Sequence, residues 1–464
     1  MRVYNNKNNL ERSITDKNFV MRVITLILAA VTAVVIFVKP QGAAAAQKKS
    51  KQAEGGVNMS LKNGVLTVKG KGAMWDTVSR TAYKKNNIKK IVVKEGVESL
   101  PRDVFKDCKK VTSIKIASTV KRIGIHAFAN TGIKSITIPK SVKKLGSGVC
   151  DGCTKLETVT MPGDIDVIKI NPRKEDYITG LFYLKGDYVS SQPLKKVKFT
   201  TALNTDILPR VGACENYEIS QKDSRFKSID GMIYTKDGKT LVRIPLGRKK
   251  AVISDKCTTV SMGSYSHELI DFSHKFLSEI VFPKSVSSVI EDPYDKKFDY
   301  NDERREDYYE CKDIKVTLNS DYLDNESIQR LWISNEYWKN SLKDELLRRE
   351  FAKLNEKDEH MMMLADGYLC TYILNDAPEG TSTVLQNLLI PDNVKTIGMQ
   401  AFKDYYTRSV ILSSSVQKIE NNAFNADYSP DSKVSNTKVY VKGNNILMAE
   451  KVFGTYQNYE IIMY

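Results

Sequence analysis

The chain has 464 residues, which is longer than one compact core usually supports, so several domains or one extended repeat array are expected. Its 71 Lys and Arg outnumber its 55 Asp and Glu, which gives a formal net charge of +16. The basic residues are spread along the chain and no aromatic-interleaved RNA motif accompanies them, so no specific nucleic acid partner is expected.

The N-terminal segment has the three parts of a signal peptide. Arg22 precedes an uncharged apolar run over residues 23–38, and a small-residue stretch ends at Ala46. We expect residues 1–46 to be this signal and residues 47–56 to be a linker. The apolar run is short for a membrane span, which needs about 20 residues. An uncleaved anchor is the alternative, and it is the only membrane contact expected. In either case the body of the chain is exported, so it is secreted or displayed on the cell surface.

Residues 57–90 predict a module that caps the array. Apolar and polar residues alternate on both sides of Asn63-Gly64, a pair typical of a tight hairpin turn. Trp75 and a helical pattern over residues 77–85 follow. This unit is unlike what comes next, and a stacked array needs such a unit to protect its first coil.

Residues 91–168 contain one apolar pattern four times, with first positions 23, 22 and 23 residues apart. A fixed period of this length predicts a leucine-rich-repeat solenoid, right-handed and mostly β with short helices and turns, in repeats of 22–23 residues. In the first three copies a Phe place follows the second strand, and it is occupied by Phe105, Phe128 and Cys150. The four copies are Ile91-Val93-Val97-Leu100, Ile114-Ile116-Val120-Ile123, Ile136-Ile138-Val142-Leu145 and Val159-Met161-Ile165-Ile168.

Beyond residue 168 the order is looser, although the array is expected to extend to residue 290. Degenerate coils begin at Val197, Ala251 and Ile280, and Tyr265 takes the Phe place in the second of them. Residues 226–245 predict an inserted hairpin with its turn at Asp237-Gly238.

Residues 291–365 predict a charged loop and a helical insertion. The helix is expected from Asn325 to His360, with ion pairs Asp344/Arg348 and Glu345/Arg349 one turn apart. Its apolar stripe is expected to pack on the side of the solenoid; a partner-binding helix is the other interpretation.

Residues 366–464 predict C-terminal repeats and a cap. Two regular coils return at residues 388–402 and 410–424, with Phe402 and Phe424 in the Phe places. Val439 and Val441 are expected to form the last strand.

Several of these repeats resemble BspA-like leucine-rich repeats. The clearest copy is Ile390-Pro391-Asp-Asn-Val394-Lys-Thr-Ile397-Gly398-Met-Gln-Ala401-Phe402, and residues 131–146 follow the same pattern. The hairpin at residues 228–245 resembles an element inserted between such repeats, and residues 61–74 resemble the N-terminal module of these proteins. The resemblance covers residues 57–290 and 366–445 and implies a bacterial surface or secreted protein. Some members of that family are adhesins.

The cysteines offer no clear chemistry. Cys150 stands in a Phe place and Cys153 is the equivalent of Cys108, so all three are expected to be buried. Cys108 and Cys153 lie two coils apart, near 10 Å, whereas a disulfide needs Cα atoms within roughly 7 Å. Unpaired thiols are therefore expected, with no metal and no cofactor.

An enzyme is not expected. On a helix, His267, Asp271 and His274 would share one face, but no fourth metal ligand is evident. No nucleophile elbow, phosphate loop or dinucleotide fingerprint occurs. A hydrolase or transglutaminase-like activity on the cell wall would require a catalytic Cys or a His-carboxylate cluster.

The candidate binding surface is the outward face of the strands. Side chains alternate along a strand, so residues between the buried positions stack coil on coil into a stripe. A Lys/Thr/Ser stripe suits an anionic glycan or an acidic protein, whereas Leu389 and Ile411 in the C-terminal coils suit an apolar partner. A merely solvated face is the alternative. The predicted stripe consists of Lys90, Val92, Ser113, Lys115, Ser135, Thr137, Thr158, Thr160, Lys196 and Lys198.

The sequence thus predicts a non-enzymatic, adhesin-like binding protein with a protein or anionic glycan ligand from host, matrix or envelope. A structural envelope spacer or assembly component is the alternative. The oligomeric state is left open.

Overall fold

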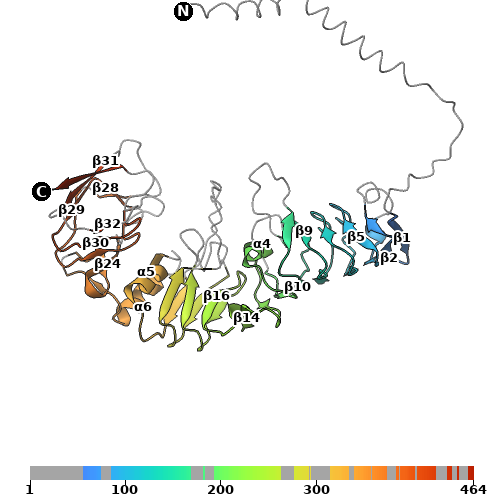
Figure 1. Cartoon of the computed structure of the whole chain (residues 1–464), viewed down its shortest axis with the longest axis horizontal. Coiled ribbons are helices and arrows are strands. Elements are labelled where there is room, and N and C mark those ends of the chain that lie inside the picture. Colours follow the sequence, from blue (N-terminus) through green and yellow to red (C-terminus); the bar gives the residue numbers. More distant parts are fainter. Residues whose placement is uncertain are drawn as a thin grey trace, which may run out of the picture. The chain divides into compact units, whose positions relative to one another are not determined.

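The computed structural model describes residues 56–74, 85–168, 181–182, 193–262, 276–291, 293, 314–333, 339–356, 358–373, 383–385, 387–402, 405–424, 436–441, 447–448 and 458–463. All of them belong to one compact unit, Ala53–Tyr464 (Figure 1). The predicted signal segment, residues 1–46, lies outside the described residues. Within these ranges, no helix is long and apolar enough to cross a membrane.

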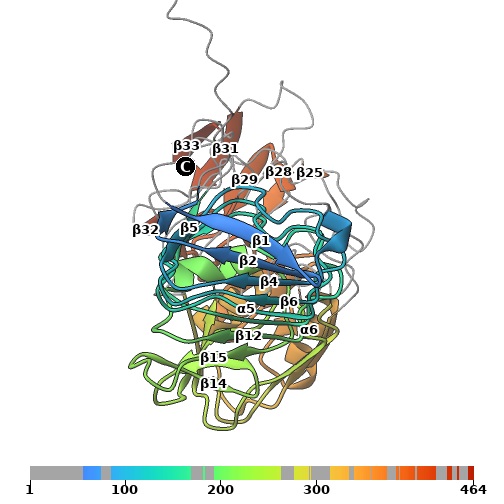
Figure 2. The same ribbon diagram turned by 90° about the vertical axis from the view of Figure 1, so that its right-hand side faces the viewer.

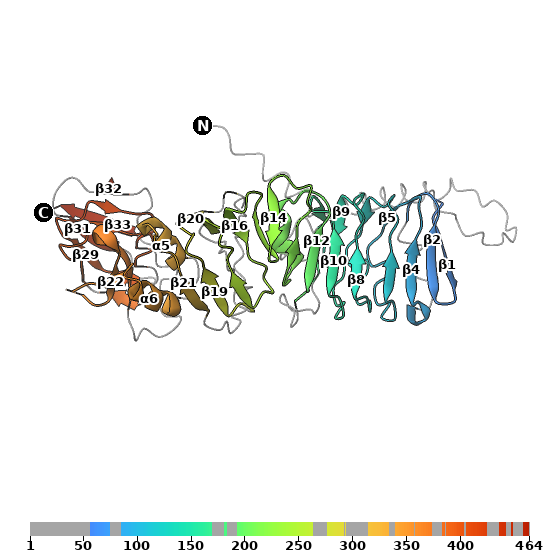
Figure 3. The same ribbon diagram turned by 90° about the horizontal axis from the view of Figure 1, so that it is seen from below.

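The N-terminal coils contribute strands to two parallel layers. The first-strand layer contains β4 (Lys90–Val93), β6 (Ser113–Lys115), β8 (Ser135–Thr137), β10 (Thr158–Met161), β12 (Lys196–Phe199) and β13 (Tyr217–Glu218). The second-strand layer contains β3 (Gly72–Ala73), β5 (Val97–Leu100), β7 (Arg122–Ile123), β9 (Lys144–Gly146) and β11 (Asp166–Ile168). Figures 2 and 3 show these strands stacked coil on coil. The predicted leucine-rich-repeat solenoid is confirmed.

The predicted repeat positions form the core of this array. Ile91 lies opposite Ile114, and Val159 lies between Ile136 and Val197 in the parallel register. Thirteen of the sixteen predicted positions are buried, while Ile114, Ile116 and Ile168 are half-buried. The first-strand layer is hydrogen-bonded as two sheets, β1-β2-β4-β6 and β8-β10-β12-β13. Two of the half-buried residues lie beside the break between these sheets.

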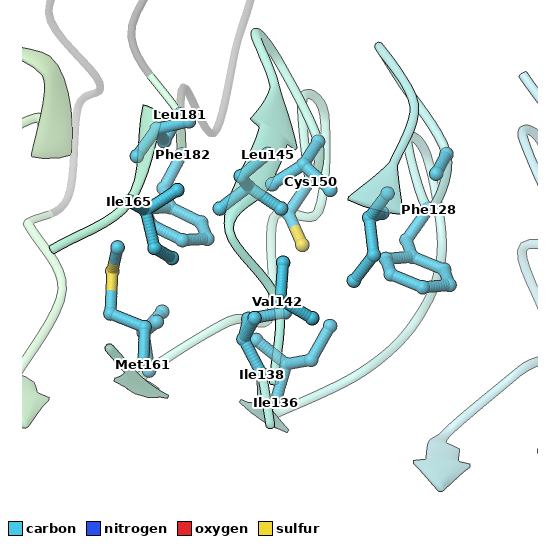
Figure 4. Packing of buried hydrophobic residues seen from close by; sticks show 14 of the residues in the cluster. Phe128, Ile136, Ile138, Val142, Leu145, Cys150, Met161, Ile165, Leu181 and Phe182 are labelled. Atoms are coloured by element: carbon cyan, nitrogen blue, oxygen red, sulfur yellow. The ribbon is translucent and has the colours of Figure 1, made fainter. Parts of the chain in front are cut away.

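The Phe places form a second buried column. The rings of Phe105 and Phe128 stack with their centroids 5.8 Å apart. Cys150 occupies the next place, fully buried, as the repeat pattern predicted. Figure 4 shows its sulfur pointing into the coil near Val142.

The turns before these Phe places repeat as well. Asp103, His126 and Gly148, at equivalent positions of three coils, have φ of 56°, 52° and 59°. This left-handed conformation is uncommon outside Gly, Asn, Asp and His, so the turn constrains which residues each repeat accepts.

The first array begins with the expected hairpin. β1 (Asn58–Lys62) and β2 (Val65–Lys69) pair antiparallel, and Asn63 and Gly64 have φ of 51° and 77°. Positive φ at both central residues is typical of a type I′ turn, whose twist matches that of the strands. β2 then pairs in parallel with β4, which connects the hairpin to the coils. Trp75 and most of the predicted helix after it lie outside the described residues.

The predicted inserted hairpin is part of a three-stranded meander. β14 (Phe226–Ile229), β15 (Met232–Thr235) and β16 (Thr240–Arg243) pair antiparallel, with turns at Asp230-Gly231 and at the predicted Asp237-Gly238. β16 continues in parallel to β18 (Thr259–Met262) and β20 (Ser288–Glu291). The side chains of the meander belong to two core clusters. Phe226, Ile233 and Val242 lie in the first cluster, and Met232, Tyr234 and Leu241 lie in the second. The meander therefore packs against both core clusters and connects them.

Other elements complete this middle region. η2 (Thr205–Ile207) and the short helix α4 (Leu208–Val211) precede β13. β17 (Lys250–Val252), β19 (Glu279–Phe282) and β21 (Lys315–Leu318) form a first-strand sheet in parallel register. Tyr265 and the charged loop over residues 294–313 lie outside the described residues.

Two helices close the open edges of the middle sheets. In α5 (Asn325–Ile333), the Ser327 hydroxyl accepts a hydrogen bond from the Val289 N–H of β20 at 2.9 Å. In α6 (Lys339–Arg348), Ser341 and Glu345 accept from the N–H groups of Val316 and Leu318 in β21, at 2.9 and 3.1 Å. These side chains replace the next strand, so helix packing on the solenoid is confirmed.

The predicted length of that helix was wrong. α6 ends at Arg348, and β22 (Lys353–Leu354) and β23 (Met361–Met363) follow. The predicted ion pairs were wrong as well, because Glu345 turns toward β21 and binds Arg348 at 2.6 Å. Arg349 instead lies 3.4 Å from Asp321.

The C-terminal array repeats the design of the first. A hairpin joins β23 to β24 (Tyr368–Tyr372) through Asp366-Gly367, and the second strands follow as β27 (Thr396–Ile397), β30 (Lys418–Ile419) and β32 (Leu447–Met448). β25 (Thr383–Leu385) pairs with β28 (Tyr405–Thr407). The first-strand sheet contains β26 (Leu388–Leu389), β29 (Ser409–Leu412), β31 (Asn436–Val441) and β33 (Asn458–Met463). The expectation that Val439 and Val441 form the last strand was wrong, because β33 pairs along the whole of β31.

Candidate binding surface

The ten predicted stripe residues, here called the polar face, all point away from the core. Lys90 lies opposite Ser113, and Val92 lies opposite Lys115. Beyond the break between β6 and β8, Ser135, Thr158 and Lys196 form one in-register row, and Thr137, Thr160 and Lys198 form another. Each of the ten side chains is exposed or half-exposed. The structure therefore brings the predicted residues together as two adjoining groups.

An acidic neighbour changes the charge of one of these groups. Glu218 in β13 lies opposite Lys198 and forms ion pairs with Lys198 and with Lys196, the latter at 3.4 Å. The hydrogen bond from Lys198 is the largest cause that holds the pKa of the Glu218 carboxyl below its usual range. Part of the positive charge expected here is thus offset within the chain. The alternation Tyr217-x-Ile219 was the sequence signal for this strand.

Lys115 differs from these two lysines. It is exposed, and no ion pair joins it to another residue in the ranges that the structure describes. Its neighbours across the ladder are Val92 and, on β2, Thr67, which lies opposite Val92. Lys115 therefore presents an unshared positive charge on the polar face.

The second-strand face carries a ladder of charges between coils. Lys121 binds Glu98 of the preceding coil at 3.3 Å, and Lys143 binds Asp164 of the following coil at 2.6 Å. Arg122 and Lys144 lie opposite each other in register and are exposed. Exposed pairs of this kind contribute little stability, so these residues chiefly keep the face charged and solvated.

The C-terminal first-strand sheet has a different outward face. Leu389 lies opposite Ile411, Ile411 opposite Tyr440, and Tyr440 opposite Ile462. We call these four residues the apolar row. Leu389 is 62% exposed and the other three are half-exposed. The two residues predicted from the sequence thus belong to a longer row. Tyr440 and Ile462 were missed because their strands follow irregular segments, although Asn458–Met463 is itself mostly apolar.

The cysteines are built into the core. Thr131 lies between Cys108 and Cys153 in the stack, with its hydroxyl 3.2 Å from the Cys153 sulfur, and this thiol donates to the Phe128 carbonyl at 3.2 Å. The six cysteines among the described residues are all unpaired and buried, and Cys311 lies outside those residues.

Burial makes three of these thiols poor nucleophiles. It raises the pKa of Cys108 and of Cys257 to about 11, and that of Cys214 to about 12. A thiol is reactive as its thiolate, so these three groups are inert near neutral pH.

The histidines do not form a site in the described ranges. The predicted His267, Asp271 and His274 lie outside the described residues. His126 lies 3.6 Å from Asp103, and burial lowers its pKa. His360 Nδ1 lies 2.9 Å from the Ile373 carbonyl. Elsewhere in the part of the chain that can be described, no three His, Cys, Asp or Glu side chains are placed to hold a metal ion.

Comparison with known proteins identifies the repeats. The model of the BspA type leucine-rich repeat region matches in six copies, over residues 76–173 and 371–448. The comparison with curated proteins gave no match.

Solved structures of other repeat proteins are similar at low identity. A leucine-rich repeat protein of Eubacterium ventriosum is 14% identical, with 79% of each chain covered and a TM-score of 0.28. The pneumococcal vaccine antigen PcpA is 12% identical, with 88% of this chain and 96% of that chain covered and a TM-score of 0.31. A leucine rich cell surface protein of Faecalibacterium prausnitzii is 15% identical, with 85% and 97% covered and a TM-score of 0.27.

At such TM-scores the assignment rests on the repeat match and on the strand register. Six matched copies, parallel strand layers and a stacked Phe column agree with one another. The chain is therefore a leucine-rich-repeat solenoid, and its residues 76–173 and 371–448 match repeats of the BspA type.

Proposed function

We propose that this chain is a non-enzymatic binding protein, secreted or held at the cell surface, that contacts its ligand through the outward faces of its first-strand sheets. Support for export comes from the signal-like pattern of residues 1–46 and from the BspA type of the repeats. Support for a binding role comes from the faces themselves. Adhesion to a host, matrix or envelope component is the form of binding that we favour.

The apolar row is the observation that carries this proposal. A water-facing position in the middle of a sheet ordinarily carries a polar side chain, and the polar face of the N-terminal array does so. Leu389, Ile411, Tyr440 and Ile462 instead form one in-register apolar line across four strands. Contiguous apolar surface of this kind typically marks a contact with a protein partner.

A second candidate ligand is an anionic glycan or an acidic protein at the polar face. Lys115 is the residue that favours it, because its charge is not shared with a described carboxylate. The hydroxyl groups of Thr137 and Thr160 lie in the adjoining group and can donate hydrogen bonds to sugar or carboxylate oxygens. Binding would consist of many weak contacts on a pre-formed surface.

The alternatives make different demands. An envelope spacer would need neither face to bind. A cell-wall enzyme of the cysteine type would need a reactive thiolate, and the buried state of Cys108, Cys214 and Cys257 argues against these three as the nucleophile.

The test compares two matched variants. Leu389→Glu places a charge in the apolar row, and Gln417→Glu adds the same charge at an exposed residue next to β30 of the second-strand sheet. Both are applied to immobilised matrix proteins, mucin and bacterial wall. We expect Leu389→Glu to weaken retention on the bound fraction at least about tenfold, and Gln417→Glu to leave it unchanged.

Thermal unfolding of both variants provides the folding control. Loss of binding only by Leu389→Glu supports the apolar row. Equal retention of both variants rejects the row as the contact, and absence of retention of the wild-type chain on every fraction favours the spacer.

A further inference from the structure

The outermost strand of the C-terminal sheet exposes its core side. β33 pairs with β31 along one edge, and Thr437, Val439 and Val441 of β31 are buried. Their register partners Tyr459, Ile461 and Met463 point to the same side of the sheet, yet they are 49%, 42% and 50% exposed. In the ranges that the structure describes, no strand lies beyond β33. An apolar strand edge of this kind is a template for further strand pairing.

Three other sheet edges, at β1, β20 and β21, are closed by distinct devices. The N-terminal edge strand β1 has a polar outward pattern, with Asn58, Ser60 and Lys62 exposed. The edges of β20 and β21 are covered by α5 and α6, whose side chains accept the strand N–H groups. Among the described residues, β33 has neither a polar outward pattern on its core side nor a covering helix.

The sequence of β33 is complementary to itself in the antiparallel direction. When two copies pair about a two-fold axis at Ile461, Ile461 lies opposite Ile461 and Tyr459 lies opposite Met463. These residues share one face in both copies, because their numbers differ by two. On the other face Glu460 lies opposite Ile462, so the two carboxylates do not oppose each other. The apolar core sides of the two arrays then join.

We propose that β33 of one chain pairs antiparallel with β33 of a second copy, forming a two-fold dimer whose sheet and core continue across the joint. Such isologous contacts need one self-complementary patch, which the Tyr459, Ile461 and Met463 row supplies. This dimer does not rest on the proposed ligand-binding role, since it uses the edge and the core side of β33, whereas Ile462 and the rest of the apolar row lie on the outward face.

The test compares Ile461→Lys with Ile462→Lys in the full chain, by sedimentation over a dilution series. Ile461→Lys places two ammonium groups opposite each other at the two-fold axis, so we expect the dimer dissociation constant to rise at least about tenfold. Ile462→Lys adds the same charge on the other face, opposite the partner's Glu460, and is expected to keep or strengthen the dimer.

A second measurement does not depend on the stability of those variants. Ile461→Cys is expected to form a covalent dimer under mild oxidation, because directly opposed residues have Cβ atoms within disulfide reach, whereas Leu389→Cys on the sheet face is not. A monomeric wild-type chain at every concentration overturns the proposal. Equal effects of Ile461→Lys and Ile462→Lys, or the absence of cross-linking by Ile461→Cys, overturn it too.

Discussion

The N-terminal and C-terminal arrays place similar side chains inside and different ones outside. In the first array Phe105 stacks on Phe128 with ring centroids 5.8 Å apart, and in the second Phe402 stacks on Phe424 at 4.9 Å. On the water side of the strands, the first array carries Lys, Thr and Ser, whereas the second carries the apolar row. Each coil must bury its apolar face against its neighbours, so the interior is constrained and the outward positions are free to vary. The outward positions are therefore where binding can be acquired.

The middle sheets and the C-terminal sheet also end differently. The middle sheets end against helices whose Ser327, Ser341 and Glu345 side chains take the place of the next strand. The C-terminal sheet ends, within the described residues, on the apolar strand β33. The edges of the middle sheets are covered by hydrogen bonds within one chain, whereas the edge of β33 can accept a strand from a second chain.

Substitutions in the two Phe columns are expected to have the largest effect on stability, and they test whether the two arrays share the same kind of interior. We expect Phe128→Ala and Phe402→Ala each to cost about 3–5 kcal/mol, because each removes a fully buried ring from a stack. Repeat arrays can unfold in parts, so hydrogen exchange of each array should be measured together with denaturant unfolding. Tolerance of either substitution, with native exchange protection in that array, would contradict a shared interior.

Single substitutions of charged residues on the polar face are expected to have smaller effects, which are measured as changes in ligand affinity. Lys115→Gln should weaken binding to a sulfated glycan by about threefold to tenfold, and Lys198→Gln by less, because the Lys198 charge is already offset by Glu218. Glu218→Gln should strengthen binding, since it releases Lys196 and Lys198. Affinity measured at two salt concentrations checks this order. An equal loss of affinity in both lysine variants would show that the ion pairs with Glu218 do not reduce the contribution of Lys198 to binding.

The smallest expected effect is a pH dependence of stability that arises in the turns before the Phe places. His126 occupies the left-handed turn position that Gln400 and Asn422 occupy in the C-terminal array. Burial is the main cause that lowers its pKa, against the opposing effect of Asp103 and Asp151. The folded state therefore favours the neutral His126 ring. The contribution of His126 to stability is fully present above the unfolded pKa near 6.5, and it is lost as the pH falls toward the lower pKa of the folded state.

His126→Asn should remove this dependence while keeping the turn, because Asn also accepts positive φ. The slope of unfolding free energy against pH from this group is at most about 1.4 kcal/mol per pH unit. It is measured as the difference between wild-type and variant unfolding from pH 5 to 8. A variant with an unchanged pH profile would exclude His126 as its source.

Local sequence patterns predicted much of the fold. The repeat spacing located the buried positions from Ile91 to Ile165, and it located Cys150 in a Phe place, because a coil's interior is determined by residues within about one period of each other. The turn at Asn63-Gly64 was predicted for the same local reason. The helix after Asn325 was predicted too long because its last turns are replaced by strand pairing at β22 and β23, a tertiary effect.

The candidate surface was predicted only in part. All ten residues of the polar face point outward, since alternation along a strand is a local property. The ion pairs of Glu218 with Lys196 and Lys198, and the addition of Tyr440 and Ile462 to Leu389 and Ile411, depend on which strands become neighbours. The segments between those strands have irregular lengths, so the period does not predict the register across them.

The sequence by itself determined the repeat type, the buried side of each coil and the outward direction of the face residues, because period and alternation act within one coil. The tertiary structure alone decided how the coils join and where they stop. It placed Glu218 beside two lysines, covered β20 and β21 with helices and, among the described strands, set β33 at the edge of the C-terminal sheet. These outcomes arise from contacts between segments far apart in the chain, whose pairing depends on the packing of the whole array.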